Sequence, residues 1–175
     1  MGLFSSLFGR SKSQPSDRDR DPANTGRALR TMMLTTPPEK IGVEPTNEFP
    51  RIYGILMDWP IDEMIATIFS TSTGTASLYT TSTFGVIGGE EHEAVRSAAI
   101  TFVRAADRFF DASKATAEYP YPTPDRVRFY FLTFGGVRVI DTDLASIENR
   151  TSNYAELFGF GQAVMTELRL IVEDN

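Results

Sequence analysis

Three short runs of apolar and β-branched residues follow one another with very little chain between them, and this spacing constrains the fold more than any other feature. The runs are Arg51–Trp59, Glu63–Ser70 and Ala76–Thr83, and turn-forming segments around Pro60 and Gly74 separate them. Parallel strands need a crossover of about a dozen residues or more, so connections this short require antiparallel neighbours. The sequence therefore predicts an antiparallel meander.

A second pair of strands is expected over Arg126–Thr142, because Gly135-Gly136 favours a two-residue type I′ turn between two apolar runs. In that register Arg128 lies opposite Asp143 and forms a cross-strand ion pair. Asp143 or Ser146 would also cap the turn that follows. Four side chains share the core face of this hairpin: Val127, Phe129, Phe131 and Ile140.

The other face of the hairpin is too apolar to face water fully. It is expected to meet the N-terminal segment, a partner protein or a second copy of the chain. For the tyrosines of the proline-rich stretch 116–124, packing of that connector onto the domain is the favoured alternative to partner contact. Candidate partner contacts are Leu132, Phe134, Val137 and Val139 on the hairpin, with Trp59 and Tyr121 in loops.

Two helices are predicted from apolar residues that recur with a period of about 3.6 residues, over Glu90–Ser113 and Thr151–Glu173. Gly159 and Gly161 lower the helix propensity of the second, which leaves a break near Gly159 open. Together with the strands, the helices give the order β-β-β-α-β-β-α. The expected fold class is α+β, with helices packed on a mostly antiparallel five-stranded sheet.

The first 48 residues differ in composition from the rest, which indicates a flexible tail over 1–48 and a single α+β domain over 49–175. The tail holds 7 Lys/Arg and 6 Asp/Glu, whereas the domain holds 10 and 17. Residues 11–48 are expected to be mostly irregular, with about two helical turns at Arg27–Leu34. The acidic domain disfavours nucleic acid as a partner.

The first residues of the chain form a short amphipathic segment, in which Leu3, Phe4, Leu7 and Phe8 share one helical face and basic residues follow. This pattern is compatible with peripheral contact with an anionic membrane through residues 2–9, but a frayed terminus, or one that docks on the chain's own domain or on a partner, is the favoured alternative. We expect no secretory signal, because the first residues lack a charged region ahead of a longer apolar stretch, and the sequence has no apolar run of about 18 residues. The expected location is the cytoplasm, including the inner face of the membrane.

A glycine-rich stretch before the first long helix is the candidate ligand site. Gly85, Gly88 and Gly89 precede His92, at a helix start whose backbone N–H groups attract anions. The stretch lacks the Gly-Lys-Ser/Thr ending of a phosphate-binding loop and the βαβ context of a dinucleotide site, so turn formation and capping are favoured. His92, the only histidine, is a candidate general base, although a surface role is more typical of such a position.

Few residues are suited to metal or thiol chemistry. The chain has no cysteine and a single histidine, which excludes cysteine-based zinc sites and multi-histidine sites. The Asp141-Thr142-Asp143 pattern fits a divalent cation, but a cap and a cross-strand pair are the commoner use of such positions. We therefore predict no metal, no cofactor and no catalytic residue.

Three segments resemble a group of small bacterial proteins of uncharacterised function: MDWPI at Met57–Ile61, the stretch Gly74–Arg96 containing ASLYTTSTFGVIGGEEHEAVR, and RVRFYF with GVRVID in the hairpin. The resemblance covers most of residues 50–172 and brings no activity or catalytic residue. The order of elements is also similar to that of type III secretion chaperone-like and YbjN-like domains, which are small, acidic and often dimeric. That similarity implies binding of another polypeptide through a sheet edge or an apolar surface.

Two functions are therefore expected to compete. The first is a non-enzymatic protein-binding adaptor or chaperone-like domain, compatible with a homodimer. The second is a small ligand-binding domain or enzyme that uses the Gly85–Gly89 loop and His92. A pocket that joins Gly88, His92 and an acidic residue would favour the second, and an apolar surface without such a pocket would favour the first.

Overall fold

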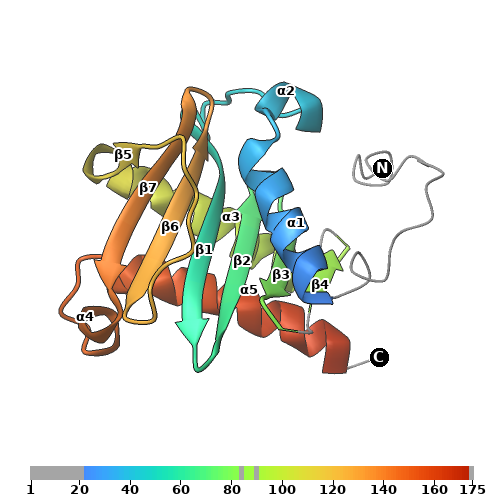
Figure 1. Ribbon diagram of the computed structural model, residues 1–175. Coiled ribbons are helices and arrows are strands. Elements are labelled where there is room, and N and C mark those ends of the chain that lie inside the picture. Colours follow the sequence, from blue (N-terminus) through green and yellow to red (C-terminus); the bar gives the residue numbers. More distant parts are fainter. Residues whose placement is uncertain (1–21, 83–84, 89–90, 174–175) are drawn as a thin grey trace.

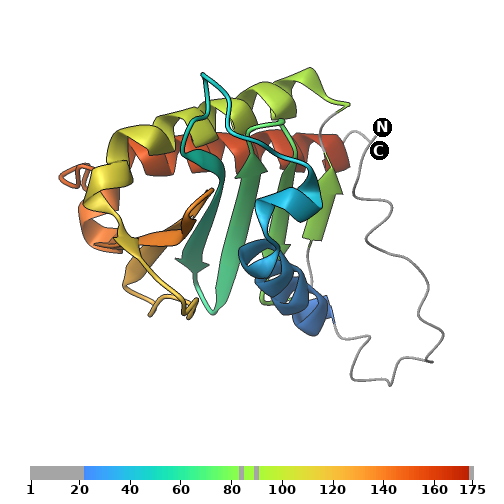
Figure 2. The same cartoon turned by 90° about the horizontal axis from the view of Figure 1, so that it is seen from above.

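The computed structural model describes residues 22–82, 85–88 and 91–173, and within these ranges it shows an antiparallel sheet with helices on both faces (Figures 1 and 2). The strand order is β4-β3-β2-β1-β6-β7-β5. The strands are β1 (Ile52–Ile61), β2 (Met64–Thr71), β3 (Ala76–Thr80), β4 (Gly85–Gly88), β5 (Lys114–Ala115), β6 (Arg126–Thr133) and β7 (Gly136–Asp143). The helices are α1 (Pro22–Thr35), α2 (Pro38–Ile41), α3 (Glu93–Ala106), the 3-10 helix η3 (Asp107–Ala112), α4 (Leu144–Glu148) and α5 (Ala155–Glu173).

The α+β class and the antiparallel pairing are confirmed, but the prediction of five strands is wrong. The described residues form seven strands, because β4 pairs with β3 at one edge and the two-residue β5 pairs with β7 at the other. The element order differs from β-β-β-α-β-β-α for the same reason, and two helices precede β1. Strands of two and four residues are too short to show a period of two in a sequence.

Helices α3 and α5 lie side by side on one face of the sheet and bury the main hydrophobic core (Figure 2). Phe102 of α3 and Met57 of β1 are fully buried there. The first expected helix ends at Ala106 and continues as η3, while α5 runs without a break through Gly159 and Gly161. A Cβ at Gly161 would lie 2.6 Å from the Met57 methyl group, so this glycine lets α5 approach the sheet closely.

The β6–β7 hairpin has the predicted core face but not the predicted register. The turn lies one residue earlier than expected, because Thr133 donates a hydrogen bond to the carbonyl of Gly136 at 2.6 Å and Gly136 takes a φ of 116°. Arg128 therefore lies opposite Asp141 and bonds to it at 2.5 Å, so the expected pair with Asp143 is wrong. A register change of two residues keeps every side chain on its face, because side chains alternate with a period of two.

The prediction that residues 11–48 are mostly irregular is wrong for the part that the structure describes. Residues 22–48 contain α1 and α2, and α1 crosses the sheet face opposite to α3 and α5 (Figures 1 and 2). Met33 and Leu34 of α1 are buried. A boundary at residue 48 thus separates α1 from the sheet on which it packs. The sequence pattern understates this helix because its apolar stripe is short and a buried Arg30 interrupts it.

Candidate functional site

The glycine-rich stretch does not form the loop expected before the first long helix. Gly85 and Gly88 are the ends of β4, whose backbone pairs with β3. Gly89 lies outside the described residues. His92 is exposed at the N-cap position of α3 and makes no side-chain capping bond. A groove formed by described residues lies elsewhere, beside α4 and α5.

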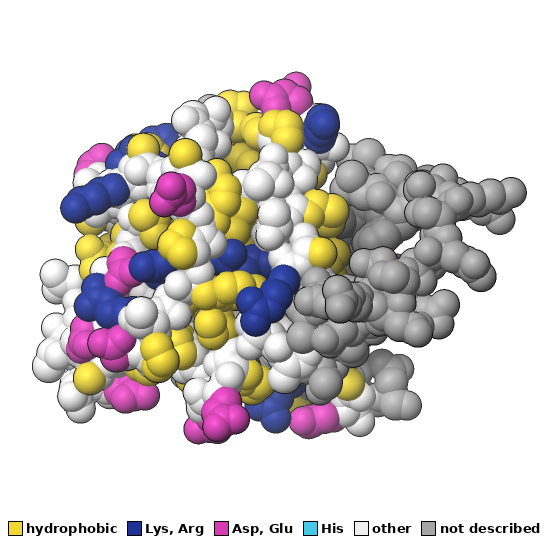
Figure 3. All heavy atoms as spheres, in the orientation of Figure 1, with side chains coloured by type: hydrophobic (Ala, Val, Ile, Leu, Met, Phe, Trp, Pro, Cys, Tyr) yellow, Lys and Arg dark blue, Asp and Glu magenta, His cyan; other side chains and the backbone are white. Residues whose placement is uncertain are grey.

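The apolar face of the hairpin is covered in part by the chain's own N-terminal region. Leu132 is only 1% exposed, so it is not available on the surface for a partner. Phe134, Val137 and Val139 are half-buried against the same cluster, which includes Met33 of α1. The N-terminal segment is therefore one of the coverings that the sequence left open. Figure 3 shows this face, where basic side chains lie among the remaining hydrophobic surface.

A buried ion pair joins α1 to the sheet. The Arg30 guanidinium donates to the Asp58 carboxylate at 2.6–3.2 Å, and the exposed fractions of the two side chains are 5% and 0%. Thr67 donates a further hydrogen bond to Asp58 at 2.6 Å. Burial raises the pKa of Asp58 above its usual range, although the bonds from Arg30 and Thr67 act in the opposite direction. Since both carboxylate oxygens are hydrogen-bonded, the role of this pair is to hold the helix in place.

Tyr121 is half-buried beside two arginines of α1. The Arg30 guanidinium lies 4.1 Å from the centroid of the Tyr121 ring, and that of Arg27 lies 5.3 Å from it. The same connector is held at Pro120, whose carbonyl accepts a hydrogen bond from Tyr130 at 2.6 Å. Tyr121 thus packs the connector onto the domain, which is the alternative that the sequence favoured.

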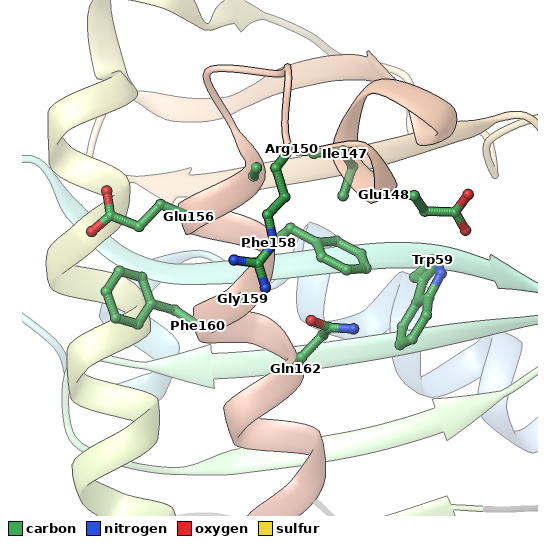
Figure 4. A pocket seen from close by; sticks show the side chains of 10 residues that line it. Trp59, Ile147, Glu148, Arg150, Glu156, Phe158, Gly159, Phe160 and Gln162 are labelled. Atoms are coloured by element: carbon green, nitrogen blue, oxygen red, sulfur yellow. The ribbon is translucent and has the colours of Figure 1, made fainter.

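An open groove with a volume of about 730 Å³ lies between α4, the first turns of α5 and the end of β1 (Figure 4). We call it the α4–α5 groove. Trp59 forms one wall, and its ring meets that of Phe158 edge-on with the centroids 5.0 Å apart. Among the predicted site residues, only Trp59 lies here. The groove is lined by Trp59, Ile147, Glu148, Arg150, Ala155, Glu156, Phe158, Gly159, Phe160 and Gln162.

Helix α4 is set in place at its N-terminus by the end of β7. The carboxylate of Asp143 accepts a hydrogen bond from the N–H of Ser146 at 2.8 Å, which confirms the predicted cap. The N–H of Leu144 donates to the carbonyl of Asp125 at 2.8 Å. These bonds fix the start of α4, and with it the groove wall that α4 provides.

Arg150 occupies a backbone position where glycine is the usual residue. It follows the C-cap of α4: its N–H donates to the carbonyl of Ile147 at 3.0 Å, and the N–H of Thr151 donates to that of Ser146 at 2.9 Å. These two bonds make a Schellman motif, which requires a left-handed residue, and the φ of Arg150 is 56°. A residue other than glycine in this conformation costs about 1–2 kcal/mol.

The side chain of Arg150 has no ion-pair partner within 4.0 Å among the described residues. Figure 4 shows it extended across the groove beside Phe158, with the carboxylates of Glu148 and Glu156 directed away from it. Glu156 instead pairs with Arg108 of η3 at 3.3 Å. The groove therefore holds a guanidinium without an ion-pair partner among the described residues, next to the ring of Phe158.

Gly159 leaves a bare stretch of helix backbone in the groove. A Cβ built at this position would meet no atom within 4 Å, so close packing does not require glycine here. Its φ is not in the left-handed region either. Glycine inside a helix costs about 1 kcal/mol relative to alanine. Two locally unfavourable residues, Arg150 and Gly159, thus line the same groove.

Comparisons with protein-family models, with curated proteins and with solved structures found no match. Within the described ranges, no group of three or more histidine, aspartate or glutamate side chains is placed to hold a metal ion. None of the helices in the described part of the chain is long and apolar enough to cross a membrane. The predicted membrane contacts Leu3, Phe4, Leu7 and Phe8 lie outside the described residues.

Proposed function

We propose that this chain is a protein-binding adaptor domain that holds a short polypeptide segment in the α4–α5 groove. The observation that carries the proposal is that Arg150 and Gly159, each unfavourable for local stability, line one groove. Such departures from local rules are typical of functional sites, where a gain elsewhere offsets the cost.

The openness of the groove favours a polypeptide over a small molecule. Small-molecule sites enclose roughly 70–90% of the ligand surface, whereas this groove is bordered by the exposed residues Glu148, Arg150 and Gly159. A bound segment belongs to a larger partner protein, which itself shields the outer side of the segment from water. The groove therefore needs to contact only one side of the segment. The partly exposed ring of Trp59, which packs edge-on against the buried Phe158, suits an apolar side chain, and the side-chain amide of Gln162 suits a peptide backbone.

The chemistry of the lining favours binding over catalysis. Its described residues include no histidine, serine, threonine, tyrosine or lysine, which are the usual nucleophiles and bases of hydrolytic and transfer reactions. Glu148 and Glu156 point to opposite sides in Figure 4, so they do not form a facing acid and base. A bound segment would be held by shape, apolar contact and one positive charge.

The test is a selection of peptides from a random library displayed on phage, with the immobilised full-length chain as bait. Enriched peptides are synthesised and titrated into the protein, and the fluorescence of Trp59 reports binding directly, because Trp59 is the only tryptophan. We expect peptides with dissociation constants in the micromolar range, as is common for segments that bind an open groove.

Two variants of α5 locate the binding site. Gly159→Leu places a large side chain inside the groove, at a position with free space around the Cβ. Thr166→Leu adds the same side chain at an exposed position of the same helix, about two turns from Gly159 and not in the groove lining. The selected peptides are expected to bind the Thr166 variant and to lose binding to the Gly159 variant. Equal binding to both variants, or failure to enrich any peptide, would overturn the proposal.

A further inference from the structure

We infer that the segment held in the α4–α5 groove carries a carboxylate next to an apolar side chain, and that Arg150 binds this carboxylate. The inference rests on the proposed function and names the chemistry of its ligand. It follows from the unpaired guanidinium of Arg150, the backbone conformation of Arg150 and the net charge of the chain.

No residue of the groove forms an ion pair with the Arg150 guanidinium. Arg150 has no ion-pair partner among the described residues, Glu156 is engaged by Arg108 at 3.3 Å, and Glu148 is directed away (Figure 4). A guanidinium binds a carboxylate through two parallel hydrogen bonds, which are stronger than bonds between neutral groups. A ligand carboxylate therefore supplies the partner that the chain does not.

The backbone at Arg150 aims the guanidinium. The Schellman bonds from the N–H groups of Arg150 and Thr151 fix the main chain at the end of α4, and the left-handed conformation sets the direction of the side chain. Glycine would satisfy the same turn at lower cost. Arginine differs from glycine at this position only by its side chain, and that side chain lies in the groove (Figure 4).

The surroundings limit the ligand to few negative charges and an apolar neighbour. The chain has a formal net charge of −6, so a segment rich in acidic residues is repelled at long range. Figure 4 shows the Phe158 ring beside Arg150 and Trp59 on the far side of that ring, and the partly exposed Trp59 ring suits a large aliphatic or aromatic side chain. One carboxylate flanked by one apolar side chain meets both conditions. The carboxylate belongs either to an acidic residue or to the end of a chain.

The test repeats the peptide selection with the wild-type chain and with Arg150→Asn, because asparagine tolerates the left-handed conformation without carrying a charge. Two display formats are used, one with peptides inside a longer chain and one with free C-termini. We expect wild-type pools that share a carboxylate beside an apolar residue, as Asp or Glu in the first format or as the terminus in the second. Synthetic peptides are made in pairs of twins that differ only in Asp against Asn, or in a free against an amidated C-terminus. The two dissociation constants of a pair measure the effect of the carboxylate on binding.

The carboxylate twin is expected to bind the wild-type chain about tenfold more tightly than its neutral twin, and this difference should vanish in Arg150→Asn. Arg150→Lys keeps the charge and is expected to retain part of the preference. Peptides that bind the groove without a preference for a carboxylate, or with the same preference in Arg150→Asn, would overturn this inference and leave the adaptor proposal standing. A wild-type chain that enriches no peptide would overturn both.

Discussion

Arg30 and Asp58, 28 residues apart in the chain, form an ion pair with a closest N···O distance of 2.6 Å, and both side chains are almost closed to water. One residue belongs to α1 and the other to the central strand β1. The pair therefore ties the N-terminal helix to the middle of the sheet. Removing one partner of such a pair leaves the other charge buried without compensation.

Replacing Arg30 tests how strongly the pair stabilises the protein. Arg30→Met is expected to lower the free energy of unfolding by about 3–5 kcal/mol, because the Asp58 carboxylate stays buried. Urea unfolding followed by Trp59 fluorescence measures the change. Arg27→Met, on the exposed side of the same helix, is the matched control and is expected to cost less than about 1 kcal/mol. The double variant Arg30→Met/Asp58→Leu should recover much of the loss, and an equal effect of both single arginine variants would contradict the assignment.

The approach of α1 to β3 depends on Gly26. A Cβ at this position would lie 2.8 Å from the carbonyl oxygen of Thr80, which belongs to the backbone and has little room to move. Alanine raises helix propensity by about 1 kcal/mol, yet Gly26→Ala is expected to destabilise the protein by about 1–3 kcal/mol through overpacking. Thermal unfolding shows whether Gly26→Ala is less stable or more stable than the wild type. Thr31→Ala, exposed on the same helix, should leave stability nearly unchanged, and a stabilised Gly26→Ala would show that α1 does not pack closely on β3.

The two unfavourable residues of the groove predict variants that are more stable than the wild type. Arg150→Gly relieves the left-handed backbone, and Gly159→Ala removes helix-interior glycine, so each is expected to stabilise the fold by up to about 1 kcal/mol. Differential scanning calorimetry measures the shift in melting temperature. Gly74→Ala is the contrasting control, because Gly74 has a φ of 93° and a Cβ there would meet the Arg96 side chain at 2.4 Å. Gly74→Ala should therefore be less stable than the wild type. If Arg150→Gly or Gly159→Ala were also less stable, that residue would not be unfavourable for local stability, and it would no longer support a functional role for the groove.

The phenol of Tyr53 predicts a loss of stability at alkaline pH. Burial raises the pKa of Tyr53 from its ordinary value of 10.0 to about 12, with the Glu39 charge acting in the same direction. The unfolded chain releases the phenol proton at lower pH than the folded chain does. The contribution of the neutral, buried Tyr53 to the free energy of unfolding is therefore complete below pH 10 and is lost as the pH rises towards 12. Unfolding in denaturant across this range, with tyrosinate absorbance as a second readout, measures it. In Tyr53→Phe the decline should be smaller, and an identical decline would assign it to other groups.

Alternating and helical periodicity carried most of the fold prediction. The core face of the hairpin is correct although its register is not, because a register error of two residues leaves every side chain on its face. The turn itself was misplaced, since the choice between adjacent glycine positions depends on the hydrogen bond from Thr133 to Gly136, which a pattern of residue types does not display. The short strands β4 and β5 exist only because the edges of β3 and β7 offer them backbone partners.

The candidate groove was nearly invisible in the sequence. The sequence predicts a contact role for Trp59, but Arg150 resembles any charged residue after a helix, and Gly159 resembles a position where a helix is weak. Their meaning depends on the left-handed backbone at Arg150 and on the empty space around Gly159. A sequence reader could have noticed the cap at Asp143 and counted one short turn to Arg150, but not that its side chain crosses a groove.

By itself, the amino-acid sequence determined the α+β class, the antiparallel pairing and the inward faces of the main strands and helices, because these follow from local periodicity and short connections. Only the tertiary structure decided that α1 belongs to the fold, because its anchor is an ion pair between Arg30 and Asp58 that forms across the chain. The tertiary structure also brought Trp59, Arg150 and Gly159 into one groove, since they come from β1, the end of α4 and α5. Contacts between residues distant in sequence depend on packing, and no local pattern encodes them.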